Sequence, residues 1–446
     1  MFKKEVYIKR RNYLKDRLKE GVVLLLGNSE EPINFPANCY RFRQDSTFLY
    51  YFGIDVPNIA AVIDIDNDRG IVFGDDLDED ELIWIKRESN LKELTDRSGA
   101  ELRQSKELKN YFRNRSVRII PQYRSSNIIK LAEIFDIKCH EVEGLVDIEL
   151  VRVIANQRLE KEEREIYEIK KAIEISKGMF EIAFEKAKDG TKEREILAEV
   201  EGYAIKNGVW LSFPTILTKD GAILHNTTHE NTLRKNDMFI LDSGVETKEH
   251  YASDITRTVP VDGEFTPLQK DIYQIVKKAQ QVSFDSIREG EMFINLHLKA
   301  ARVIAEGLKE LGFLKGGIDD IMQNHAYALF FPHGLGHPLG LDVHDLEALG
   351  ENYVGYDESV KRSNIFGLKS LRFARKLKEN YVMTIEPGIY FIPKLIKKWY
   401  EEAKFKEFIN YDRAFEMLDF GGIRLEDDVL VLKDSCDVLS ESIIKT

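Results

Sequence analysis

The sequence predicts an α/β (α+β) protein with two domains, and three observations support this prediction. Short apolar runs typical of strands alternate with segments of helical periodicity. The chain has 446 residues, which is enough for more than one hydrophobic core. Its character changes near Asn156, after which it becomes strongly helical. We therefore predict a mixed α/β domain over residues 1–156 and a second domain over residues 157–446.

The composition narrows the possible classes of protein. The net charge of −12 argues against binding to nucleic acid as the main function. The three cysteines lie far apart, so we expect neither a disulfide framework nor a thiolate zinc site. The N-terminus is charged and lacks the apolar core of a signal peptide, and the run at 22–26 is too short to cross a bilayer. We expect a cytoplasmic protein that binds neither nucleic acid nor a membrane.

The first domain is expected to contain a buried strand and a hairpin. The sequence GVVLLLGN is a short apolar run between glycines, which predicts the strand. Residues 58–74 hold two apolar runs separated by the turn-forming stretch Asn67–Gly70, which predicts the hairpin. The acidic run at 74–81 is expected to be a solvated loop that leads into a helix rather than a cation site.

The second domain is expected to combine amphipathic helices with strands. Helical periodicity begins at Glu160, and Thr266–Pro267 has the N-cap residue and the first-turn proline of a further helix. Apolar runs predict two strand pairs, 237–245 with 250–261 and 381–392 with 421–432.

Four acids lie on or next to these predicted strands: Asp242, Asp254, Glu386 and Glu426. Each acid alone would more often be capped or solvent-facing, because burying an unpaired carboxylate is costly. Four of them together with the histidine-rich segment 333–344 favour a metal site. Four clustered carboxylates repel one another, and two divalent cations would cancel their charge. With only one imidazole added, at least two acids would have to bridge the ions, and this oxygen-rich set suits a hard ion such as Mn²⁺.

Several motifs resemble the metallopeptidase family that holds methionine aminopeptidase, aminopeptidase P and prolidase. The segments LDSGVE, HYASDITRTVP, HGLGHPLGLDVHD, MTIEPGIY and GGIRLEDDVLV are similar to the branch of aminopeptidase P and prolidase. The segment YRFRQDSTFLYYFG resembles the N-terminal domain of that branch. The resemblance implies an aminopeptidase P/prolidase-type domain over 1–156. It also implies a "pita-bread" domain over 157–446, with a curved, largely antiparallel sheet covered by helices.

The resemblance implies a centre with two divalent ions, Mn²⁺ by preference and Co²⁺ or Zn²⁺ as alternatives. The implied metal ligands are Asp242, Asp254, His337, Glu386 and Glu426. Asp254 and Glu426 would bridge the ions. Glu386 would also handle the proton of the nucleophilic water, which makes it a catalytic residue as well.

The resemblance also implies residues that contact the substrate. Three histidines would be catalytic: His225, His333 and His344. His344 would support the tetrahedral intermediate. Arg372 would grip the free carboxylate of a dipeptide, with a surface arginine as an equal alternative. Arg424 would bind substrate and, with Asp427, steady the carboxylates. The remaining histidines are expected to be surface or packed residues: His140, His250, His297 and His325. His229 lies near His225 in the sequence, and a non-catalytic residue is favoured there less strongly.

The implied enzyme is a hydrolase, a metal-dependent exopeptidase that cleaves the bond between an N-terminal residue and proline through a hydroxide bridging two metal ions. It would be an Xaa-Pro aminopeptidase whose peptide substrates include Xaa-Pro dipeptides. The alternatives are a strict Xaa-Pro dipeptidase (prolidase), another enzyme of the same fold such as methionine aminopeptidase or creatinase, and a non-catalytic binding protein. The family suggests a homodimer. The native metal, the oligomeric state, the preferred peptide length and the residue before proline stay open.

Overall fold

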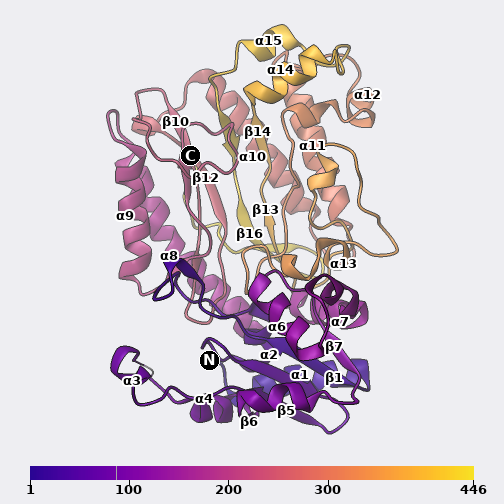
Figure 1. Ribbon diagram of the computed structural model, residues 1–446. Helices are drawn as coiled ribbons and strands as arrows, with labels where there is room; N and C mark the ends of the chain where they lie inside the picture. Colours follow the sequence, from indigo (N-terminus) through magenta and orange to yellow (C-terminus); the bar gives the residue numbers. More distant parts are fainter. Residues whose placement is uncertain (87, 446) are drawn as a thin grey trace. The chain divides into compact units, whose positions relative to one another are not determined.

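The computed structural model describes residues 1–86 and 88–445. Two compact units make up the chain (Figure 1). The first unit comprises Met1–Gln157 together with Leu346–Val354, and the second comprises Arg158–Asp345 and the chain from Gly355 onward. Helix α7 (Ile148–Leu159) runs through position 156, at which the sequence predicts a domain boundary.

A five-stranded mixed sheet lies at the centre of the first unit, in the order β6–β5–β4–β1–β7. Its strands are β1 (Val22–Leu26), β4 (Ala60–Asp64), β5 (Arg69–Phe73), β6 (Glu101–Arg103) and β7 (Val117–Ile119). The middle strands β1, β4 and β5 pair antiparallel, and the edge strands β6 and β7 pair parallel to their neighbours. The predicted strand at 22–26 and the predicted hairpin, which is β4–β5, are confirmed. Every residue of β1 is buried, which explains its uninterrupted apolar run.

Short helices and one small hairpin complete the first unit. The helices are α1 (Lys4–Leu18), α2 (Ser46–Phe52), α3 (Glu81–Trp84), α4 (Leu91–Ser98), α5 (Leu108–Tyr111), α6 (Ser125–Phe135), α7 and α13 (Glu351–Val354), and the hairpin joins β2 (Pro32–Phe35) to β3 (Asn38–Cys39). Helix α6 packs on the sheet, because Leu131 shares a core cluster with Leu24 and Val62. The acidic run at 74–81 leads into α3 and its acids are exposed, as the sequence predicts.

The second unit consists of two halves with a similar arrangement, in which a pair of helices packs on antiparallel strands. The first half holds α8 (Glu163–Lys186), α9 (Glu193–Lys206), β8 (Trp210–Leu211), β9 (Ile216–Thr218), β10 (Met238–Ser243), β11 (Val245–Glu246) and β12 (Ile255–Pro260). The second half holds α10 (Pro267–Ser286), α11 (Phe293–Glu310), β13 (Val382–Ile385), β14 (Gly388–Tyr390), β15 (Gly422–Arg424), β16 (Asp427–Val431) and β17 (Cys436–Val438). Three short helices join this half: α12 (Ile318–Gln323), α14 (Pro393–Glu401) and α15 (Tyr411–Phe415). Helix α8 contacts β10 and β12, and α10 contacts β13 and β14.

Both predicted strand pairs of the second unit are confirmed, but the second pair is split. Strands β10 and β12 pair antiparallel, with Asp242 opposite Thr256. The run 381–392 forms β13 and β14, which pair with β16 and β15 respectively. The interruption lies at Pro387, which has no N–H to donate to a ladder. The predicted N-cap is also confirmed, since the Thr266 side chain accepts a hydrogen bond from the backbone of Gln269 at the start of α10.

Within the described part of the chain, no helix has both the length and the apolar character needed to cross a membrane.

Candidate metal centre

The four predicted acidic ligands lie where strands of the second unit begin, end or break. Asp242 is the penultimate residue of β10, and Asp254 directly precedes β12. Glu386 directly follows β13, and Glu426 directly precedes β16. A bridge between Thr256 and Glu426 joins the two halves at this level. The strand ends of both halves therefore meet, and this brings acids from distant parts of the sequence together.

All five predicted ligands fall into two overlapping groups of potential metal-binding atoms. In each group, every side chain offers one ligand atom, and these atoms lie within 4.8 Å of one another. One group is Asp242, Asp254 and Glu426, and the other is His337, Glu386 and Glu426. A third group of the same kind consists of Asp254, His337 and His344. His344 also lines the pocket.

The acids fit cations because their negative charge is buried without enough compensation. Asp242, Asp254 and Glu426 are at most 8% exposed. Among the described residues, none donates a hydrogen bond to Oδ1 of Asp242, although that atom is buried. Burial, together with the neighbouring carboxylate of Asp242, raises the pKa of Asp254 well above its ordinary value. Burial and the carboxylate of Asp254 do the same to the pKa of Glu426. Burial also raises the pKa of Glu386. Divalent cations would remove this penalty, since a bound cation favours the charged carboxylate.

His337 is oriented with one ring nitrogen turned toward the acids. Its Nδ1 lies 3.1 Å from the carbonyl oxygen of Pro338, so Nδ1 carries the proton and Nε2 is left as an electron-pair donor. Nε2 lies 3.4 Å from Asp254 Oδ2 and 3.8 Å from Glu386 Oε1. This is the tautomer that a metal-binding histidine requires.

The segment that carries His337 is docked on β13. The His337 amide donates to Thr384 Oγ1 at 3.1 Å, and the Thr384 amide donates to the His337 carbonyl at 2.9 Å. A Cβ on Gly336 would lie 1.9 Å from the Thr384 carbonyl oxygen, so only glycine fits at that position. The glycine before the histidine in "HGLGH" is therefore required for the close approach of two backbones.

A hydrogen-bond network holds the side chains of two of the acids, Asp242 and Glu426, in place. The Thr256 hydroxyl donates to Glu426 Oε2 at 2.7 Å and accepts from Arg424 Nε at 3.2 Å. Arg424 also donates to Asp242 Oδ2 at 2.6 Å and to the Tyr390 hydroxyl at 3.0 Å. Sequence reasoning missed Thr256 and Tyr390. The only signal for Thr256 is the two-residue alternation that places it on the same strand face as Asp254.

Asp427 supports the centre less directly than the resemblance implies. Its carboxylate binds Arg257 Nη2 at 2.7 Å and Lys445 Nζ at 2.6 Å. Arg257 in turn donates to the Glu426 carbonyl at 2.7 Å. The neighbouring Asp428 makes the closer contact, since its Oδ2 accepts from the Asp254 amide at 3.2 Å.

A pocket of about 500 Å³ opens onto these residues. It is lined by every predicted metal ligand and by the other residues to which the resemblance gives a role in catalysis or substrate binding: His225, His333, His344, Arg372 and Arg424. Apolar side chains such as Phe213, Ile216 and Leu224 form part of its wall. The Tyr390 hydroxyl lies 2.9 Å from His333 Nε2. Burial, assisted by the guanidinium of Arg424, lowers the pKa of His333 to about 3, so this imidazole is neutral at pH 7.

The other histidines lie off this pocket, as far as the described lining shows. His297 is fully buried and stacks on Phe331, and His250 is buried beside Glu246. His140 is exposed, and His325 is partly buried. His229 lies 2.9 Å from the Leu217 carbonyl through its Nδ1, so it helps to hold a loop against β9.

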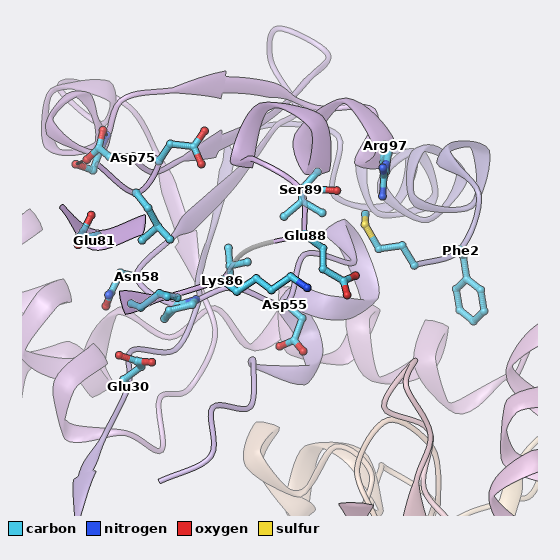
Figure 2. A pocket seen from close by; sticks show the side chains of 18 of the residues that line it. Phe2, Glu30, Asp55, Asn58, Asp75, Glu81, Lys86, Glu88, Ser89 and Arg97 are labelled. Carbon is cyan, nitrogen blue, oxygen red and sulfur yellow. Dashed lines mark hydrogen bonds between the residues drawn. The ribbon is translucent and has the colours of Figure 1, made fainter. Parts of the chain in front are cut away.

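The first unit holds a larger pocket, of about 1090 Å³, that lacks these features. Figure 2 shows that carboxylates of Glu30, Asp55 and Glu88 line it together with Lys86 and Arg97. None of the predicted site residues and no histidine belongs to its described lining. Its charges of both signs are typical of a solvated surface, and the chemistry points to the smaller pocket.

Comparison with known proteins agrees with the motifs. The model of metallopeptidase family M24 matches residues 167–433, and that of the aminopeptidase P N-terminal domain matches residues 7–118. A probable Xaa-Pro aminopeptidase of Fusarium vanettenii is 33% identical over 95% of this chain and 89% of that protein. An Xaa-Pro dipeptidase of Homo sapiens is 29% identical over 95% of this chain and 87% of its own length. A zinc-substituted Escherichia coli aminopeptidase P in complex with product has a TM-score of 0.81 and 25% identity, and covers 100% of this chain and 96% of that one.

Proposed function

The chain belongs to metallopeptidase family M24, with the pita-bread fold of its aminopeptidase P branch, and from this premise we propose that it removes the N-terminal residue from peptides with proline in the second position. Xaa-Pro dipeptides are among the proposed substrates. The observation that carries the proposal is the convergence of five side chains that could bind metal on one pocket. The chain is a hydrolase of this family, and the relatives named Xaa-Pro aminopeptidase and Xaa-Pro dipeptidase support the substrate class.

The proposed metal ligands are Asp242, Asp254, His337, Glu386 and Glu426. Divalent ions bound there would acidify a water molecule and polarise the scissile carbonyl. The predominance of oxygen ligands supports Mn²⁺, with Co²⁺ and Zn²⁺ as alternatives. We also propose two domains at 1–156 and 157–446 and a cytoplasmic location, as the sequence predicts, and a homodimer, as the resemblance implies.

The chain's own groups are placed for the proton transfers. Glu386 lines the pocket with its Oε2 3.7 Å from His333 Nδ1, and its carboxylate can take a proton from the attacking water. The same carboxyl would return that proton to the departing proline nitrogen. The proline nitrogen carries no N–H, so a site that requires no hydrogen bond from it is an advantage. His225, His333 and His344 line the pocket where they can contact the peptide and the developing oxyanion.

The test of the proposed function compares three peptides with metal-reconstituted protein. These are an Xaa-Pro dipeptide, an Xaa-Pro tetrapeptide and the same tetrapeptide with alanine for proline. We expect cleavage of the two proline peptides only, lost on chelation and restored by Mn²⁺. Glu386→Gln should lower kcat by about 100- to 10,000-fold. Glu379→Gln is the matched control, because Glu379 is exposed seven positions earlier. Wild-type turnover by Glu386→Gln would contradict the assignment.

A strict Xaa-Pro dipeptidase is the second candidate, and the position of Arg372 on the pocket favours it. A guanidinium there could bind the free carboxylate of a dipeptide, which a longer peptide lacks at that position. Arg372→Ala should then raise KM for the dipeptide by roughly 10- to 100-fold, because a charge-assisted hydrogen bond is lost. The tetrapeptide and the exposed control Lys369→Ala should change little. Equal effects on both peptides would remove this candidate.

A further inference from the structure

A buried ion cluster, formed by Arg158, Lys161 and Asp345, lies beside the pocket and has no part in the proposed chemistry. Arg158 Nη2 lies 2.6 Å from Asp345 Oδ1, and Lys161 Nζ lies 3.1 Å from Asp345 Oδ2. The side chains of the three residues are 3%, 1% and 1% exposed. Arg158 also approaches Asp342 at 3.3 Å, but that side chain is 37% exposed. Three fully buried charges are unusual, because each loses its hydration.

The cluster holds its charges firmly in place. Burial alone would raise the pKa of Asp345, but Arg158 and Lys161 outweigh burial and hold the pKa below its ordinary value. Lys161 is further fixed by a 2.7 Å hydrogen bond from Nζ to the Arg158 carbonyl. Its backbone amide donates to the Asn380 carbonyl at 2.9 Å. Both cations therefore sit on a rigid support near the start of α8, and Asp345 is held against that support.

Asp345 closes the turn that follows His337. Its amide donates to the Pro338 carbonyl at 2.9 Å, so residues 338–345 form a closed turn. Inside the turn, Gly340 lies directly against the Asp345 carboxylate. A Cβ on Gly340 would stand 2.4 Å from Asp345 Oδ2 and 2.9 Å from Lys161 Cε. The carboxylate thus occupies the space that a larger residue at 340 would need.

His344 is the residue directly before Asp345 in this turn. Its ring centroid lies 4.1 Å from that of His337, and both rings line the pocket. The turn begins at a β-bridge between Pro338 and Met383, and the Leu339 amide donates to the Val382 carbonyl at 3.0 Å, but residues 341–344 lie in neither helix nor strand. We propose that Asp345, bound by Arg158 and Lys161, is a positioning residue that holds His344 over the pocket. This inference rests on the proposed function, because it assigns His344 a part in the reaction.

The kinetic test uses the metal-loaded enzyme and an Xaa-Pro peptide. Asp345→Asn should lower kcat by roughly 10- to 100-fold with little change in KM, as the loss of an outer partner of an active-site histidine does. Asp342→Asn is the matched control, since Asp342 contacts the same arginine but is far more exposed than Asp345, and it should stay within about twofold of wild type. Equal losses in both variants would overturn the proposal.

The discriminating measurement is the double variant with His344→Ala. If Asp345 acts through His344, adding Asp345→Asn to His344→Ala should lower kcat by no more than about twofold further, because the two changes remove the same contribution. A purely structural ion cluster would instead lower kcat by the same factor in both backgrounds. That multiplicative result would overturn the proposal.

A structural measurement separates this inference from the proposed function. In a crystal structure of Asp345→Asn, we expect the His344 ring to leave its position over His337 while the strands keep their register. An unmoved ring would overturn the inference even if the wild type cleaves Xaa-Pro peptides. Absence of such cleavage by wild type would refute the function alone. If Asp345→Asn does not fold, Gly340→Ala carries the same tests, because its added methyl group displaces the carboxylate and keeps all charges.

Discussion

The two sides of the pocket are supported in different ways. The carboxylate side, formed by Asp242, Asp254, Glu386 and Glu426, lies at strand ends that ladder hydrogen bonds hold in register. The histidine side, formed by His225, His333, His337 and His344, lies on segments without regular structure. Irregular segments need other anchors, and here these are the hydroxyl and amide of Thr384, the Asp345 ion cluster and the buried Glu193. A rigid sheet can thus carry ligands directly, whereas loops require a buried polar partner for each turn.

Burial acts in opposite directions on the two sides. It raises the pKa of Asp254 and Glu426 and lowers the pKa of His333. Both shifts favour the uncharged form, since burial penalises any charge. Cations would therefore change the charge of the carboxylate side and leave the imidazole of His333 neutral.

The largest effect is expected from removing a carboxylate that both ligand groups share. Glu426→Gln should lower kcat/KM by about 1000-fold or more, because it disturbs every ion in the centre. Bound metal, measured by elemental analysis after dialysis, should fall in parallel. Asp434→Asn removes an exposed acid from the same region and should keep both quantities. Full metal content with lost activity would show that Glu426 is not a ligand.

The histidine side can be displaced without altering any ionisable group. Gly336→Ala places a methyl group against the Thr384 carbonyl and should destabilise the fold by about 1–3 kcal/mol or more. Metal affinity should fall as well, because His337 is the next residue. Gly202→Ala, in the exposed interior of α9, meets no neighbouring atom and should stabilise by about 0.5–1 kcal/mol. Denaturant unfolding measures the change in the free energy of unfolding for both variants. If Gly336→Ala stabilised the fold as Gly202→Ala does, the close contact between residue 336 and the Thr384 carbonyl would be refuted.

The metal-free carboxylate side should make stability fall as the pH rises, and bound metal should remove this dependence. Because the pKa of Asp254 and of Glu426 is raised in the fold, these carboxyls contribute stability that is fully present below their unfolded pKa, about 4, and is lost as the pH rises through the folded pKa. In chelator, Tm should therefore fall by several degrees between about pH 5 and about pH 8. Metal-loaded protein should not show this fall. If Tm changed with pH in the same way with and without metal, the carboxylates would not form a buried charge cluster that binds cations.

The sequence predicts the carboxylate side better than it predicts its supports. Asp242 and Glu386 each follow an apolar run, and such a pattern marks a strand end whose acid needs a partner. Thr256 and Tyr390 could not be singled out, because a hydroxyl on a strand is also an ordinary strand former. The pairing of Arg158 with Asp345 joins residues 187 positions apart, and no local pattern specifies it. Local chemistry is thus readable from sequence, whereas buried pairs between distant segments require the fold.

The smallest effect is expected at the anchor of the loop that carries His225. Glu193 is fully buried at the start of α9 and accepts from the Lys219 amide at 2.7 Å and from the Asn231 amide at 3.3 Å. It therefore ties together both ends of the segment 219–231. Glu193→Gln keeps the shape of the side chain but replaces one acceptor oxygen by an amide donor that faces other donors. This change should lower the free energy of unfolding by about 1–3 kcal/mol.

This anchor tests whether a loop on the histidine side depends on its buried partner alone. We expect Glu193→Gln to speed proteolytic cleavage within 219–231 and to lower kcat/KM by about 10-fold or less, because His225 is displaced rather than removed. Glu199→Gln, six residues along the same helix and exposed, should change neither quantity. An unchanged cleavage rate in Glu193→Gln would mean that other contacts hold the loop. The histidine side would then resemble the carboxylate side, because backbone hydrogen bonds rather than a buried charge would hold it in place.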